Sequence, residues 1–218
     1  MTNLLQRLQG AGYKTRLQNP FDEFWDWRLG IKTSGYHPGS GQQGDAEWYL
    51  HYAPTPYREL FRLFRLVNLG PDDVFTDLGS GMGRAVFAAS WMGVRRSVGI
   101  ELVESLSAKA NENLARTNIK GRDVQFRCAN ALHVNLGDAT VLFMFHPFGE
   151  TTMAQVLAQL HEAREKGDAP PLRIIYRNPV CNHVLEQAGW LRCLARVEGE
   201  GPPISTARRY QATLWTTD

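Results

Sequence analysis

A glycine-rich turn between an apolar strand and a helical stretch constrains this sequence more than any other feature. An apolar run that begins at Val74 ends in Asp77, and the alternating glycines Gly79, Gly81 and Gly83 follow it. Glycines let a backbone approach a ligand closely, and the start of a helix offers unpaired N–H groups. The pattern therefore predicts a buried strand, a tight turn and a helix whose start binds a ligand.

A second apolar strand ends in an acid at the distance expected for a strand–helix–strand unit. The segment Ser97–Ile100 leads directly into Glu101. A carboxylate at this position can accept hydrogen bonds from both hydroxyls of a ribose. The two motifs together predict a cofactor that contains adenosine, bound in the crevice of an α/β sheet.

The spacing of the glycines separates two classes of cofactor. The dinucleotide pattern G-x-G-x-x-G/A needs a small third residue, but that position holds Arg84, which argues against a nicotinamide-dependent oxidoreductase. The spacing G-x-G-x-G, with an acid two residues ahead of it, instead resembles the class I S-adenosylmethionine-dependent methyltransferases. The resemblance implies S-adenosyl-L-methionine as the cofactor and Glu101 as its ribose ligand. It also implies that the methionine end and the sugar face Asp77, Gly79, Ser80, Gly81 and Gly83.

Strands and helices alternate along most of the chain. Strands are expected at 74–78, 97–101, 124–128, 140–145 and 173–177, and helices at 84–92, 103–117, 151–165 and 181–188. A further helix is expected at 58–69, and a β-hairpin at 190–198 and 207–215. This order predicts an α/β fold with a doubly wound, mostly parallel seven-stranded sheet and one antiparallel strand, the Rossmann-like methyltransferase fold.

Residues 1–56 differ from the rest and are expected to form an N-terminal cap or lid, followed by a methyltransferase domain at 57–218. The aromatic side chains that mark this segment are Phe21, Phe24, Trp25, Trp27, Tyr36, Trp48 and Tyr49. A stretch rich in glycine and polar residues spans 34–45. The segment either packs on the core as a cap with a loop, or closes over cofactor and substrate with the glycine-rich stretch as its hinge.

The end of the third strand supplies a candidate for the adenine contact, because ligands bind beyond the carboxyl ends of parallel strands. Asn130 and Ala131 follow this strand. The resemblance implies that a side chain here accepts the adenine amino group. The Asn130 amide oxygen could do so, or Asn130 could simply form the turn.

The segment after the fourth strand is where the methyl acceptor is expected. Amino-group methyltransferases commonly carry Asn-Pro-Pro-aromatic there, and this chain has Phe145-His146-Pro147-Phe148. The resemblance implies Phe145 beside the cofactor and Phe148 as a wall of the catalytic pocket. His146 takes the place of the asparagine: a neutral imidazole could act as a general base, or it could only shape the turn. After the fifth strand, the polar corner Tyr176-Arg-Asn-Pro179 could hold substrate or form a plain turn from strand to helix.

Motifs outside the glycine turn extend the resemblance to a little-described bacterial branch of these methyltransferases. They are Phe21-Asp22, Lys32-Thr-Ser-Gly35, Tyr52-x-Pro-Thr-Pro-Tyr57 and the Pro-Phe-Gly turn that ends at Gly149. The non-SET-domain lysine methyltransferases share the Asp-Leu-Gly-Ser-Gly turn, and this similarity implies cofactor contacts from Tyr52, Thr55 and Tyr57. We therefore expect an enzyme that methylates a nitrogen of a protein lysine or of a small amine. O-methylation of a small molecule and a non-catalytic cofactor-binding protein stay open as alternatives.

Composition and charge exclude few other functions. The 218 residues carry a net charge of +2, which does not indicate a nucleic-acid partner. Of the three cysteines, Cys128 is expected in the core, and Cys181 with His183 does not complete a metal site, so no metal is expected. No apolar run approaches the roughly 18 residues that span a bilayer, so we expect a cytoplasmic protein without a membrane partner. The methyl acceptor, a protein or a small molecule, and the oligomeric state stay open.

Overall fold

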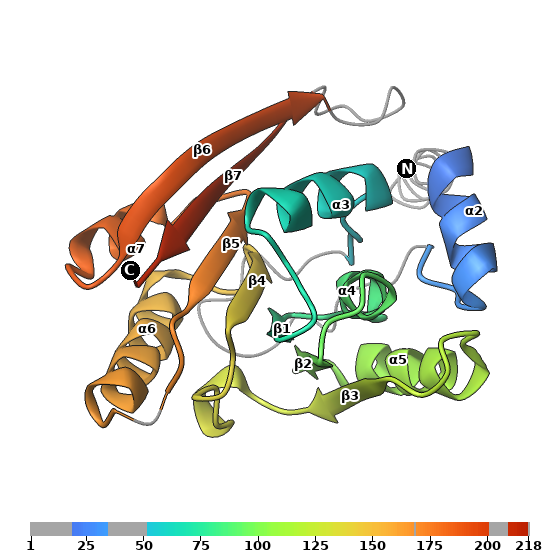
Figure 1. Cartoon of the computed structure of the whole chain (residues 1–218), viewed down its shortest axis with the longest axis horizontal. Coiled ribbons are helices and arrows are strands. Elements are labelled where there is room, and N and C mark those ends of the chain that lie inside the picture. The colour runs from blue at the N-terminus through green and yellow to red at the C-terminus, as the bar shows by residue number, and fades with distance from the viewer. Residues whose placement is uncertain (1–18, 35–51, 168, 201–208, 218) are drawn as a thin grey trace, which may run out of the picture.

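The computed structural model describes residues 19–34, 52–167, 169–200 and 209–217 (Figure 1). The glycine-rich stretch beyond Ser34 and the aromatic residues Tyr36, Trp48 and Tyr49 lie outside these ranges. The choice between a cap and a lid, and the domain boundary at residue 56, therefore stay predictions.

Seven strands form one sheet in the order β3-β2-β1-β4-β5-β7-β6 (Figure 1). Their bounds are β1 Val74–Leu78, β2 Arg96–Glu101, β3 Asp123–Cys128, β4 Val141–Phe145, β5 Arg173–Arg177, β6 Arg192–Glu200 and β7 Arg209–Thr216. The first five strands pair in parallel, and β7 runs antiparallel to both of its neighbours. This arrangement confirms the predicted fold class. The strand order reverses between β1 and β4, and ligands bind at this switch point in open α/β sheets.

Helices cover both faces of the sheet and bury two separate apolar clusters. The helices are α3 Tyr57–Leu66, α4 Arg84–Trp91, α5 Glu104–Arg116, α6 Glu150–Glu165 and α7 Asn182–Gln187. One cluster joins α3 and α4 to the strand residues Phe75 and Phe143, and Leu114 of α5 packs against it. The other cluster joins α6 and α7 to Leu142 and Met144. Neighbouring residues of β4 thus pack into clusters on opposite faces of the sheet, because side chains alternate along a strand.

The connection between β3 and β4 departs from the regular alternation. It contains only the short 3-10 helix η1, Ala131–His133, in place of a full covering helix. The edge strand β3 is consequently half exposed along its length. Cys128 at its end is exposed, so the expectation that it is a core residue was wrong.

One helix of the N-terminal segment, α2 Pro20–Leu29, was not anticipated. The Asn19 side chain accepts a hydrogen bond from the backbone N–H of Phe21 at 3.1 Å, which caps the helix start. At the other end Gly30 takes the left-handed conformation with φ 70°. Trp25 packs edge-on against Phe61 of α3, with ring centroids 4.8 Å apart. The described part of the aromatic-rich segment is therefore a short capped helix that packs on α3 through Trp25.

In the described ranges, no helix combines the length and the apolar character needed to cross a bilayer. Within the same ranges, no group of three or more His, Cys, Asp or Glu side chains is arranged to hold a metal ion.

Candidate functional site

Two adjoining cavities lie at the carboxyl ends of the parallel strands. The first, of about 330 Å³, lies between the glycine turn, the segment before α3 and the end of β4. The second, of about 280 Å³, lies over the ends of β2 and β3. Gly79, Glu101 and Pro147 line both cavities, so the two adjoin.

The two cavities bring together all but two of the site residues predicted from the sequence. The first is lined by Tyr52, Thr55, Asp77, Gly79, Ser80, Gly81, Glu101, Phe145 and His146. The second is lined by Asn130, Ala131 and Phe148, together with Gly79 and Glu101. Gly83 and Tyr57 line neither cavity, and Tyr57 is fully buried. Phe148 and His146 are thus on different sides of Pro147, in different cavities.

The glycine turn is shaped by two close contacts. Gly81 has φ 55°, and a Cβ there would lie 2.3 Å from the ring of Tyr52. Gly83 has φ 94°, and a Cβ there would lie 2.5 Å from the ring of Phe126. A side chain at either position would collide with an aromatic ring as well as strain the backbone. Gly81 therefore lets Tyr52 close one wall of the first cavity, and Gly83 lets α4 pack close to β3.

Glu101 fixes the backbone around the turn. Its Oε2 accepts a hydrogen bond from the N–H of Gly81 at 2.7 Å, and its Oε1 accepts one from the N–H of Val103 at 2.9 Å. Each carboxylate oxygen has two lone pairs. Glu101 can therefore hold the turn and still accept hydrogen bonds from the hydroxyls of a ribose.

Asp77 presents a buried carboxyl group to the first cavity. Its side chain is only 4% exposed and has no hydrogen-bond partner among the described residues. Burial, and then the charge of Glu101, raise the pKa of Asp77 well above its ordinary value. A cationic group such as the ammonium of the methionine portion would compensate both effects. The site therefore fits S-adenosylmethionine.

His146 lies at the end of β4 with a left-handed backbone, φ 41°. Its Nδ1 lies 3.1 Å from the hydroxyl oxygen of Tyr176, which also accepts a hydrogen bond from the N–H of Cys181 at 3.1 Å. Burial lowers the pKa of His146 below its ordinary value of 6.5, so the ring is neutral at neutral pH. The structure thus holds a neutral, oriented imidazole at the rim of the first cavity.

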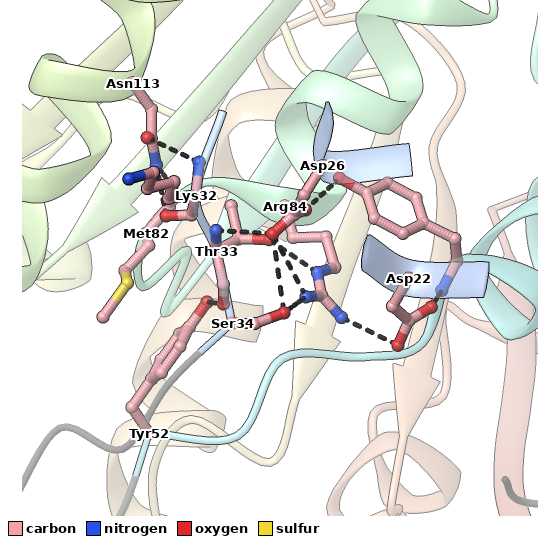
Figure 2. A network of polar contacts seen from close by, with 10 residues as sticks. Asp22, Asp26, Lys32, Thr33, Ser34, Tyr52, Met82, Arg84 and Asn113 are labelled. Atoms are coloured by element: carbon pink, nitrogen blue, oxygen red, sulfur yellow. Dashed lines mark hydrogen bonds and ion pairs between the residues drawn. The ribbon is translucent and has the colours of Figure 1, made fainter. Parts of the chain in front are cut away.

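A buried arginine connects the cofactor turn to the N-terminal segment (Figure 2). Arg84, the first residue of α4, donates from Nε to Thr33 Oγ1 at 2.7 Å and from one terminal nitrogen to Asp22 Oδ2 at 3.1 Å. Its other terminal nitrogen donates to Ser34 Oγ at 2.8 Å and lies 3.7 Å from Asp26 Oδ2. Burial disfavours the charged form of Arg84, but Asp26 and the other acidic partners raise its pKa above its ordinary value.

The same network organises the strand-like segment after α2. Asp26 accepts hydrogen bonds from both the N–H and the hydroxyl of Thr33 at 2.7 Å, and from the hydroxyl of Tyr57 at 2.9 Å. The Tyr52 hydroxyl donates to the carbonyl oxygen of Thr33 at 2.8 Å, and burial raises its pKa, so it stays a donor. On the other side, Asn113 of α5 accepts from Lys32 N–H and donates to its carbonyl (Figure 2).

Sequence reasoning did not assign a role to Asp22, Asp26 or the buried Arg84. The motifs Phe21-Asp22 and Lys32-Thr-Ser-Gly35 were visible in the sequence, and the network shows what most of their residues do. The capping residues Asn19 and Gly30 were the local signal that would have placed α2.

Known proteins resemble this chain in sequence and in fold. A family model described as "Histone methylation protein DOT1" matches residues 50–123. A protein-lysine N-methyltransferase of Saccharolobus islandicus is 28% identical over 143 residues, which are 65% of this chain and 81% of that protein. An H3 lysine-79 specific histone-lysine N-methyltransferase of Caenorhabditis elegans is 44% identical over 52 residues, which are 23% of this chain and 6% of that protein.

Among solved structures, an RNA methyltransferase of Salinibacter ruber in complex with S-adenosyl-L-homocysteine is similar with a TM-score of 0.54. The two chains are 23% identical, and the match covers 76% of this chain and 94% of that one. At this identity the similarity shows a common fold.

Replacing Arg84 by Met should destabilise the protein by about 3–5 kcal/mol, because Asp22 and Asp26 would be left buried without their cation. The matched control is Arg96→Met, since Arg96 pairs with Asp123 and Asp138 at the surface, and its loss should cost about 1 kcal/mol or less. Urea unfolding at pH 7.5 measures both changes. Equal losses in the two variants would contradict the structural role of the network.

Replacing Asp77 by Asn should stabilise the cofactor-free protein and weaken cofactor binding. Because the pKa of Asp77 is raised in the folded state, the stability linked to this group is complete below pH 3.8 and is lost as pH rises through the folded pKa. At pH 8 we expect a gain of roughly 1–2 kcal/mol in urea unfolding.

The same variant should bind S-adenosylhomocysteine about tenfold more weakly or worse in calorimetry, because a charge-assisted hydrogen bond is lost. A variant that bound as tightly as the wild type would show that Asp77 does not contact the cofactor.

Proposed function

Since this chain is a class I S-adenosylmethionine-dependent methyltransferase, we propose that it methylates a nitrogen of a protein lysine or of a small amine. The observation that carries the proposal is that the residues directly after β4 and β5, which line the first cavity, carry no charge. The residues there are His146, which is neutral, and Asn178. An amine must give up its proton before it can react, and an uncharged polar surface does not favour its ammonium form as a carboxylate would.

The relatives support the same choice of acceptor atom. The match to the archaeal protein-lysine N-methyltransferase covers 81% of that protein, well beyond the glycine turn. The DOT1 family model also extends past the turn, from residue 50 to residue 123. The similarity to an RNA methyltransferase concerns the fold alone.

The chemistry asks mainly for positioning and exclusion of water. When bound, S-adenosylmethionine supplies an activated methyl group: the acceptor lone pair bonds to its carbon as the carbon–sulfur bond breaks, leaving S-adenosylhomocysteine and a released proton. Asp77 would hold the methionine end of the cofactor, and Glu101 would hold its ribose. Tyr52 closes one wall, and the carbonyl of Thr33 fixes its ring. His146 and Asn178 contact the acceptor.

A second acceptor class, a hydroxyl group, is favoured by one observation. The imidazole of His146 is neutral and held at Nδ1 by the hydroxyl of Tyr176. When the Tyr176 oxygen accepts from Nδ1–H, the lone pair at Nε2 can take a proton from a hydroxyl. When Tyr176 donates to Nδ1 instead, Nε2 carries the proton and His146 is a hydrogen-bond donor. A hydroxyl acceptor needs the first arrangement.

A methyl-transfer assay tests the proposed function directly. With tritiated-methyl S-adenosylmethionine, the protein should label poly-L-lysine or putrescine at least tenfold faster than catechol or bulk tRNA. Acid hydrolysis of labelled poly-L-lysine should yield methyllysine. Label on catechol alone would support the hydroxyl alternative, and label on tRNA alone would overturn the choice of acceptor. Binding of S-adenosylhomocysteine without any transfer would support a non-catalytic protein.

Replacing His146 by Asn separates the two acceptor classes. Asn adopts the left-handed backbone readily and offers an amide oxygen to an amine, so amine methylation should stay within about tenfold of the wild type. Methylation of a hydroxyl by a general base should fall by about 100-fold or more. The control is His161→Asn, since His161 of α6 stacks on Trp190 and lines neither cavity. A loss of more than 100-fold with amines would make His146 an essential base for nitrogen as well.

A further inference from the structure

We propose that Asn178, at the end of β5, binds the methyl acceptor through its side-chain amide oxygen, which accepts a hydrogen bond from the acceptor N–H. The inference deepens the proposed N-methylation and rests on it for the identity of the acceptor atom. The sequence pattern predicted an acceptor contact after β4, whereas Asn178 follows the neighbouring strand β5.

The sheet register places Asn178 beside His146. Phe145 of β4 pairs with Arg177 of β5, and these are the last paired residues of both strands. His146 and Asn178 are therefore the first residues beyond the sheet on two neighbouring strands. Both line the first cavity, as do Asp77 and Gly79 of the glycine turn.

The two residues share an unusual backbone conformation. Among the described residues, three that are not glycine have a positive φ: Asn68 at 52°, His146 at 41° and Asn178 at 51°. His146 and Asn178 each precede a proline, a position that normally favours an extended backbone. Strained conformations of this kind cluster at functional sites, where the surrounding structure holds them in place. Asn68 follows α3 and lines neither cavity.

The hydrogen bonds around Asn178 hold its backbone and leave its side chain available. Its N–H donates to the carbonyl oxygen of Gln211 at 2.9 Å, and its own carbonyl accepts from the N–H of Val180 at 2.8 Å. The side chain is exposed at the mouth of the cavity and has no hydrogen-bond partner among the described residues. The backbone is thus fixed by two neighbours, and the exposed amide side chain is available to a ligand in the first cavity.

An amide oxygen suits a nitrogen nucleophile for a simple chemical reason. It accepts a hydrogen bond from N–H and so orients the nitrogen, while the lone pair stays free for the methyl carbon. Because the amide is uncharged, it gives less preference to the unreactive ammonium form than a carboxylate would. Asn178 therefore supplies orientation without holding the acceptor in its protonated state.

The test measures binding affinity, so that its result does not depend on methyl transfer. The probe is an analogue of S-adenosylhomocysteine in which nitrogen replaces sulfur and carries a 4-aminobutyl arm; the reference compound carries a butyl arm. Calorimetry should show that the wild-type protein prefers the amine arm by about fivefold to tenfold. In Asn178→Gly this preference should disappear, while affinity for S-adenosylhomocysteine stays within twofold of the wild type.

Glycine is chosen because it adopts the left-handed backbone without strain, so the variant keeps the conformation of the strand end. Asn68→Gly is the matched control: the same replacement at the same φ, away from the cavities, should leave the preference intact. A preference that survives in Asn178→Gly would overturn the proposal, and so would a wild-type protein that does not distinguish the two arms. The methyl-transfer assay tests the proposed N-methylation separately: label on catechol or tRNA alone would contradict N-methylation without bearing on this binding test.

Discussion

The buried guanidinium of Arg84 is the interaction on which the candidate site depends. A cation that is 4% exposed must be compensated inside the protein, and its partners come from α2 and from the segment that follows it. Arg84 is also the first residue of the helix that begins at the cofactor turn. The residues that neutralise it therefore fix the N-terminal segment against the turn, and through Thr33 they fix Tyr52 on Gly81. One network of buried polar contacts thus joins the candidate cofactor site to the described part of the N-terminal segment.

The sequence was sufficient for features encoded by local pattern. The apolar strand ending in Asp77, the alternating glycines and the acid at Glu101 follow from short stretches of chain, and the strand bounds agree within one or two residues. The antiparallel strand near the C-terminal end of the chain was also predictable, because a hairpin follows the last parallel strand. The predicted site residues gather at two adjoining cavities because the carboxyl ends of parallel strands meet at one edge.

Features that depend on distant partners were not predictable from the sequence. Arg84 lies 62 positions from Asp22 and 51 from Thr33, and hydropathy places an arginine at the surface. Gly83 belongs to the glycine motif, but a glycine is required there because the ring of Phe126 from β3 leaves no room for a side chain. The apolar pattern around Cys128 predicts a core residue, but Cys128 is exposed because only the short η1, and not a full helix, follows β3. In each case the environment of the residue is set by an element that is distant in the sequence or that the sequence pattern does not reveal.

The two halves of the site are specified by different physical means, and this difference bears on how an acceptor is selected. The cofactor half is set by backbone geometry and two buried acids, which leave little room for variation. The half that we propose binds the acceptor contains His146 and Asn178, whose left-handed conformations before proline are accessible mainly to Asn, Asp, His and Gly. Few side chains can therefore occupy these positions without reshaping two strand ends. A change of acceptor is more readily achieved by exchanging amide, imidazole and carboxylate there than by remodelling the walls of the cavity.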